Sequence, residues 1–226
     1  MKIQIISLII GMFSFGILCF HFSMERQNAE SLTKATNVVI EYSPSKRLFH
    51  SVESQYDLNK MVVKIQLTDE YNQMDVAAQF AVLEYFNRQI RYILRNTTFN
   101  NSIYDLNLEI IGQVDSNIYH LTNVVPENQS FLQAYSRFFK NGEMVYTTSQ
   151  LQNAISLYRD EDSFNQKHKE ILQYSYRFFN MITKNGRYYE PERDNEVISD
   201  MIARKFDITS EEYSQLYLDY YFHFAK

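Results

Sequence analysis

The residue types that most often bind metal ions are too widely spaced along this chain to form a local metal motif. The chain has five histidines, and no two are three or four residues apart, the spacing that places two ligands on one helix face. The single cysteine, Cys19, lies in the apolar N-terminal run, which excludes internal disulfides and thiolate clusters. The acidic run 160–162 begins like a calcium loop, but Phe164 takes the next ligand position and no glycine follows. We therefore predict no metal site and no cofactor.

Motifs for nucleotide binding and for nucleophilic catalysis are missing from the sequence as well. Only Gly112, Gly142 and Gly186 lie outside the N-terminal run, and no two of them can share one phosphate-binding loop. The chain has no G-x-S-x-G sequence, and the S-x-x-K match at 31–34 lacks its partner motifs. We predict no catalytic residue. An enzyme whose site is built from scattered residues, such as a hydrolase of envelope material, is the alternative.

The segment 202–216 has the apolar spacing of a helix-turn-helix, but its charges oppose DNA binding. Residues 190–226 hold nine acids and four bases, an excess equal to the whole formal net charge of −5. Glu211 and Glu212 would stand at the start of the recognition helix and repel phosphates. With Thr209 they suit a capped helix N-terminus instead. We therefore predict a helix pair and no nucleic-acid partner; a cytoplasmic regulator acting on DNA is the less favoured reading.

Aromatic side chains are the most abundant groups with binding chemistry. The chain has 18 tyrosines, 17 phenylalanines and no tryptophan. Most of those in the C-terminal half recur every three or four residues, which is typical of a helix face packed into a core. Some do not fit one stripe, and because tyrosine combines apolar area with a polar tip we predict that they form a partner surface. These residues are Tyr174, Tyr176, Tyr188, Tyr189, Tyr221 and Phe222.

The N-terminus predicts a membrane anchor. Residues 3–24 carry no formal charge, and about 20 helical residues span the roughly 30 Å of bilayer hydrocarbon. We therefore predict a transmembrane signal anchor over 1–24, with the lipid bilayer as partner through 3–24. A cleaved signal peptide is the alternative, although its best small-x-small pair, at 14–16, lies inside the apolar run. Lys2 and the chain amine favour a cytoplasmic N-terminus, which places the remaining chain outside the cytoplasm.

Hydrophobic periodicity predicts an α+β fold after the anchor. Residues 25–46 are mostly polar, and we expect an irregular stalk there. Over 47–125, alternating apolar residues predict two strands, a spacing of three to four predicts a helix near 76–93, and alternation then returns for two more strands. The order ββαββ suits a small sheet with one face covered by the helix. Over 126–226 we predict a mostly helical region packed against that layer, including a helical stripe at 131–139.

These features together predict a single-pass protein of the cell membrane with its C-terminal domain outside the cytoplasm. The anchor, the lack of a catalytic motif and the surplus of aromatic residues favour a non-catalytic binding or assembly module, with an envelope protein as a possible partner. A secreted protein with a cleaved signal peptide is the alternative architecture.

Overall fold

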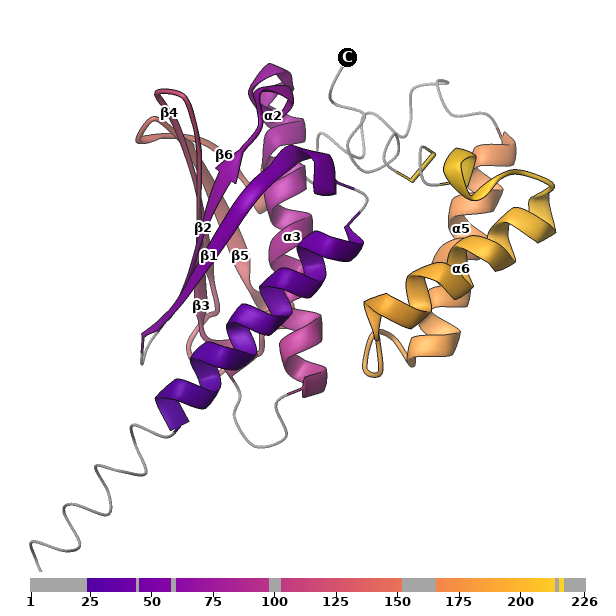
Figure 1. The fold of residues 1–226 in the computed structure, drawn as a ribbon, viewed down its shortest axis with the longest axis horizontal. Coiled ribbons are helices and arrows are strands. Elements are labelled where there is room, and N and C mark those ends of the chain that lie inside the picture. Colours follow the sequence, from indigo (N-terminus) through magenta and orange to yellow (C-terminus); the bar gives the residue numbers. More distant parts are fainter. Residues whose placement is uncertain are drawn as a thin grey trace, which may run out of the picture.

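The chain folds as an α+β protein with one six-stranded sheet and several helices, as predicted (Figure 1). The computed structural model describes residues 24–43, 45–57, 60–97, 103–151, 166–213 and 216–217. Residues 1–23 of the predicted anchor over 1–24 therefore lie outside the described residues. Among the helices that are described, none combines the length and the apolar character needed to cross a bilayer.

The strands lie in the sheet in chain order, and all neighbours are antiparallel except one pair. The parallel pair is β2 and β3, which are joined through α3 (Val76–Thr97). A parallel pair requires such a crossover, and the helix of the crossover packs back onto the sheet. The strands are β1 (Phe49–Asp57), β2 (Lys60–Leu67), β3 (Asn107–Val114), β4 (Asn117–Val124), β5 (Tyr135–Lys140) and β6 (Glu143–Thr147).

The predicted ββαββ order is confirmed, and α3 forms the centre of the molecule. The side chains of β2, β3 and β4 alternate between buried and exposed positions, so one sheet face packs against α3. Gly112 lies on this inner face, where an added Cβ would stand 2.5 Å from Cδ1 of Leu67. The glycine therefore permits a close approach in the core, which also contains Phe80, Leu83, Phe86, Ile90, Ile110 and Leu121.

The predicted helical stripe at 131–139 is wrong, because this segment forms a 3₁₀ turn and a hairpin. Phe131 belongs to η3 (Phe131–Gln133), and β5 and β6 pair as an antiparallel hairpin. Asn141 and Gly142 connect the two strands with φ of 53° and 85°. Two successive residues with positive φ favour a tight hairpin turn, and Asn-Gly supplies both. The spacing of aromatic residues resembled a helix, although Phe138 in fact faces the buried side and its neighbours do not.

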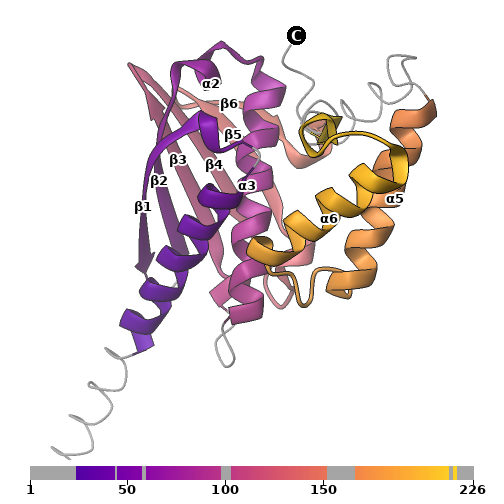
Figure 2. The same cartoon turned by 45° about the vertical axis from the view of Figure 1, so that its right-hand side comes forward.

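Residues 25–46 do not form the expected irregular stalk. A helix runs over 24–42 and packs on the same side of the sheet as α3 (Figures 1 and 2). Asn28, Leu32, Ala35 and Val39 are buried at intervals of four, three and four residues, which is the spacing of one helix face. The remaining positions are mostly polar and exposed, and they dominated the composition from which the stalk was predicted.

Residues 166–206 are mostly helical, as predicted, and they belong to a second hydrophobic core. The two long helices are α5 (Gln166–Thr183) and α6 (Pro191–Phe206), and Ile171, Phe178 and Ile202 lie between them and the residues that follow. This pair docks on the C-terminal end of α3, where Nδ2 of Asn96 donates to the carbonyl oxygen of Tyr189 at 2.7 Å. The short helices are η1 (Lys46–Leu48), α2 (Asp69–Gln73) and η2 (Ile103–Asp105).

Candidate functional site

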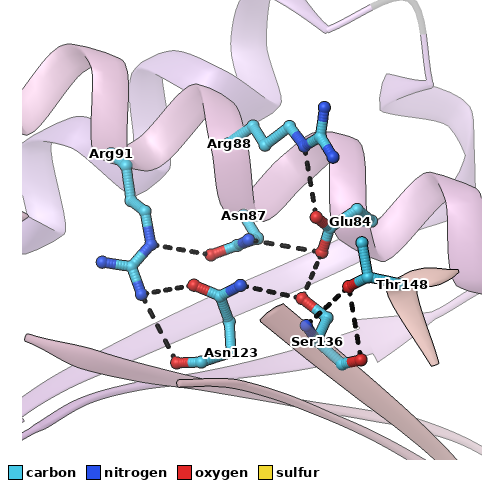
Figure 3. A network of polar contacts seen from close by, with 7 residues as sticks. All are labelled: Glu84, Asn87, Arg88, Arg91, Asn123, Ser136 and Thr148. Atoms are coloured by element: carbon cyan, nitrogen blue, oxygen red, sulfur yellow. Dashed lines mark hydrogen bonds and ion pairs between the residues drawn. The ribbon is translucent and has the colours of Figure 1, made fainter. Parts of the chain in front are cut away.

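A chain of buried polar side chains joins α3 to the sheet (Figure 3). Arg91 is only 1% exposed, although arginine is almost never fully buried unless it is paired. Its Nη1 donates to the carbonyl oxygens of Tyr104 and Leu106, and Nη2 donates to Oδ1 of Asn123. One guanidinium group thus binds the η2 turn at the start of β3 and the end of β4, which fixes the return of the crossover to the sheet.

Burial lowers the pKa of Arg91 to about 10, while the nearby carboxylates of Glu84 and Asp105 oppose this shift. The side chain therefore stays charged at neutral pH. The charge is stabilised by three oxygens that accept from it and by Oδ1 of Asn87, which accepts from Nε at 3.2 Å. With a longer bond from Nη2 to the carbonyl oxygen of Asn123 at 3.5 Å, the guanidinium makes five hydrogen bonds, which matches its five N–H donors.

The network continues from Asn123 to a carboxylate. Nδ2 of Asn123 donates to Oγ of Ser136 at 2.8 Å, and that hydroxyl donates to Oε2 of Glu84 at 2.5 Å. The other carboxylate oxygen of Glu84 accepts from Nε of Arg88 at 3.1 Å. The backbone of Ser136 exchanges two hydrogen bonds with Oγ1 of Thr148. Residues from α3, β4, β5 and the segment after β6 are therefore connected in one chain of contacts.

This network contains a serine next to a carboxylate, but a substrate cannot reach this buried pair in the folded structure. Ser136 has no exposed surface, and Glu84 and Asn123 are also buried. The Ser136 hydroxyl already donates one hydrogen bond and accepts another, so no acyl group can approach it without the α3 interface opening. The network therefore holds the sheet in place against α3 and does not form an accessible catalytic centre.

The other face of the sheet is not covered by a long helix of the described part. The helix over 24–42, α3, α5 and α6 all lie on one side of the sheet (Figures 1 and 2). We call the opposite side the open face. One row of directly paired residues crosses it over all six strands, and the row runs Glu53, Lys64, Ile111, His120, Phe139 and Met144.

The open face carries apolar side chains towards β6, together with Arg137 of β5, and further charged side chains on β1, β2 and β3. Ile118 and Met144 are 48% and 59% exposed, which is high for apolar side chains of this size. Nζ of Lys60 on β2 lies 3.4 Å from Oε1 of Glu109 on β3, and Glu53 on β1 is paired with Lys64 on β2. A surface that combines an apolar area with surrounding charged residues is typical of a protein interface.

His120 occupies the middle of this row, and its surroundings shift its pKa. Burial lowers its pKa from 6.5, and the carboxylate of Glu109 opposes this shift. Its Nε2 lies 3.9 Å from Oε2 of Glu109 and its ring centroid lies 5.8 Å from that of Phe139. The neutral imidazole therefore extends the apolar area formed with Phe139.

Of the aromatic residues predicted as a partner surface, the four that the structure describes are divided between exposed and packed positions. Tyr176 and Tyr188 are exposed, and Tyr188 lies between Nζ of Lys184 and the guanidinium of Arg187. Tyr174 stacks on Phe178 in the second core. Tyr189 is buried, and its hydroxyl donates to Oδ1 of Asn195 at 2.7 Å.

Burial raises the pKa of Tyr189 well above its ordinary value, so its hydroxyl serves packing. Tyr221 and Phe222 lie outside the described residues. In the described part, the predicted surface therefore divides into two exposed and two packed tyrosines. No group of three or more His, Cys, Asp or Glu side chains in the described ranges is placed to hold a metal ion.

Sequence reasoning did not find the buried network, although one signal was present. One face of an otherwise apolar helix carries polar residues at intervals of three, one and three positions, namely Glu84, Asn87, Arg88 and Arg91. Polar residues on a helix that is buried on most sides must find partners inside the protein. The partners Asn123 and Ser136 could not be identified from spacing, because they lie on strands far away in the sequence.

Comparisons with known proteins returned no match, either to a protein-family model, to a curated protein or to a solved structure. The function is therefore argued from the geometry of the open face and from the sequence.

Proposed function

We propose that the protein is a non-catalytic binding module, anchored in the cell membrane by residues 3–24 and displayed outside the cytoplasm. In this proposal a partner protein of the envelope packs on the open face of the sheet. The observation that carries the proposal is the row across this face, in which the imidazole of His120 lies between the apolar residues Ile111 and Phe139, and Met144 follows on the next strand.

The chemistry of the open face favours a protein over a small ligand. Its apolar residues lie on a sheet surface, where large rings and aliphatic side chains can be covered by another flat surface. Met144 is flexible and adapts to different partner shapes. The charged residues on β1, β2 and β3, which include Glu53, Lys64 and Glu109, would set the orientation of a partner more than its affinity.

The buried polar network supports a binding role in a different way. Ser136 and Glu84, a serine next to a carboxylate, are hydrogen-bonded to each other and buried between α3 and the sheet. A rigidly supported sheet loses little conformational entropy when a partner binds, which favours recognition by a pre-formed surface. In this proposal the buried network holds one face of the sheet against α3, and the opposite, open face is available to a partner.

Site-specific photo-crosslinking in the native cell tests this proposal. A photoreactive amino acid is placed at Ile118 or Met144 on the open face, and at Tyr176 on α5 as a matched exposed control. We expect one adduct of the same mass from both open-face positions and none of that mass from Tyr176. Adducts that are equal at all three positions, or missing from both open-face positions, would contradict the proposal.

A charge substitution provides the second arm of this experiment. Ile118→Glu places a carboxylate in the apolar area, and burying it without a partner is costly. The crosslink from Met144 should therefore decrease strongly in the Ile118→Glu background. Tyr176→Glu is the matched control, and it should leave the Met144 crosslink unchanged.

A further inference from the structure

The helix over 24–42 begins where the predicted anchor ends, and it is part of the folded domain. Asn28, Leu32, Ala35, Thr36 and Val39 are all buried, with Leu32 fully inaccessible to solvent. The first of these residues lies only four positions after Met24. The predicted anchor is therefore followed by a packed helix and not by a flexible stalk.

The start of this helix lies at one defined end of the sheet. The helix has 19 residues and is about 28 Å long, which is close to the roughly 30 Å of the nine-residue β1. The two elements run in opposite directions, because the chain passes from the end of the helix through η1 directly into β1. Oγ1 of Thr33 lies 2.8 Å from Oγ of Ser54, which places the middle of the helix beside the second half of β1.

The N-terminal end of the described helix therefore lies at the end of the sheet where β1 ends and β2 starts, as the ribbon shows in both views (Figures 1 and 2). Since β3 runs parallel to β2, the connection between β4 and β5 is at this same end of the sheet. That connection contains Leu132, which is 62% exposed. The turn between β3 and β4, with Asp115 and Ser116, is at the opposite end.

We infer that the end of the domain formed by the β1–β2 and β4–β5 connections faces the lipid headgroups directly, with a fixed orientation. This inference rests on the proposed anchor over 3–24. A chain that enters the packed helix within a few residues of the bilayer has no spacer that could let the domain stand away from it or rotate freely. The strands of the open face then run roughly perpendicular to the membrane plane. The β3–β4 turn lies about 25 Å further from the headgroups than the β1–β2 connection.

The chain contains no tryptophan, so a single introduced tryptophan reports its own distance from the membrane. The full chain is reconstituted in vesicles that carry a dansyl acceptor on the lipid headgroup. Asp57→Trp places the donor at the inferred near end, and Ser116→Trp places it at the far end. We expect energy transfer to be several-fold higher from position 57, because transfer falls steeply with distance. Equal transfer from both positions in the membrane-bound chain would overturn the inference.

A second pair of variants guards against a local folding defect. Leu132→Trp and Ile118→Trp replace exposed apolar residues at the near and far halves of the sheet, and they should give the same order of transfer. Insertion of twelve Gly and Ser residues after Met24 should remove most of the difference in both pairs. A difference that persists at full size with this linker would overturn the inference.

The failure of the anchor itself is separately visible in the same preparation. If the chain leaves the vesicles on an alkaline carbonate wash, the proposed anchor is wrong and the inference fails with it. If the chain stays in the vesicles and the two positions transfer equally, the anchor stands and only the fixed orientation is refuted.

Discussion

Replacement of Arg91 tests whether the buried network holds the sheet against α3. Arg91→Met keeps a long apolar stem but removes every donor. It leaves the carbonyl oxygens of Tyr104 and Leu106 and Oδ1 of Asn123 without their partner. A buried acceptor that loses its hydrogen bond costs about 1–3 kcal/mol, and breaking a buried charged network costs about 3–5 kcal/mol. Removal of the buried charge returns part of this cost. We therefore expect a loss of about 3 kcal/mol in the free energy of unfolding.

Arg88 provides the matched control for this experiment. It also bonds to Glu84 from α3, but its side chain is 56% exposed. Exposed ion pairs contribute about 0–1 kcal/mol, so the free energy of unfolding of Arg88→Met should be close to that of the unmodified protein. The free energy of unfolding of Arg91→Lys should lie between those of Arg91→Met and Arg88→Met. Lysine retains the charge, but it lacks the planar guanidinium that binds several separate oxygens at once.

Urea unfolding of the full chain in detergent micelles, followed by far-ultraviolet circular dichroism, measures these differences. The comparison uses the transition midpoint, provided that the dependence on urea concentration is the same for each variant. If Arg91→Met unfolded within about 1 kcal/mol of the unmodified chain, the network would not be the main attachment of α3 to the sheet.

Three further experiments test other parts of the fold. Leu32→Ala should lower the free energy of unfolding by about 2–5 kcal/mol, whereas a residue in a solvated stalk would give almost no change in the same urea assay. Gly186→Ala should destabilise the docked helix pair more than Gly142→Ala in thermal unfolding. Both glycines have positive φ, but only at position 186 would the new Cβ meet a side chain, at 2.9 Å from Cε1 of Tyr92. His120 binds protons less readily in the folded state, so the unfolding free energy should decrease as the pH falls below about 6.5. His120→Gln should flatten this part of the pH profile, and an unchanged profile would contradict the assigned burial.

The sequence predicted those elements whose packing appears as a regular period. Strands β1 to β4 alternate between the two faces, and α3 carries apolar residues at three to four residue intervals, so their order could be derived without the structure. Local periodicity was sufficient there because each element has one clearly apolar face.

The elements that sequence reasoning missed lack such a contrast. The helix over 24–42 buries a narrow face that includes Asn28 and Thr36, so its average composition indicated a solvated segment. In β5, Phe138 and Phe139 are adjacent and point to opposite faces, which gave the spacing of a helical stripe. The Asn-Gly turn was the better signal there, since it favours a hairpin irrespective of the flanking period.

The candidate site depended on information that local patterns do not contain. The open face brings together residues from six strands, and the row of paired residues that crosses it becomes visible only when the register of every strand pair is known. The buried network likewise joins Glu84 to Ser136 over 52 positions of sequence.

Labelling of a cysteine on the open face in intact cells tests the proposed function most directly. Cys19→Ser removes the single native thiol, and Met144→Cys places a new one on the exposed part of the open face. A membrane-impermeant maleimide should label this cysteine without permeabilisation of the cells, and more strongly in cells that lack the crosslinked partner. Labelling that occurs only after the membrane has been opened would contradict an extracytoplasmic binding module.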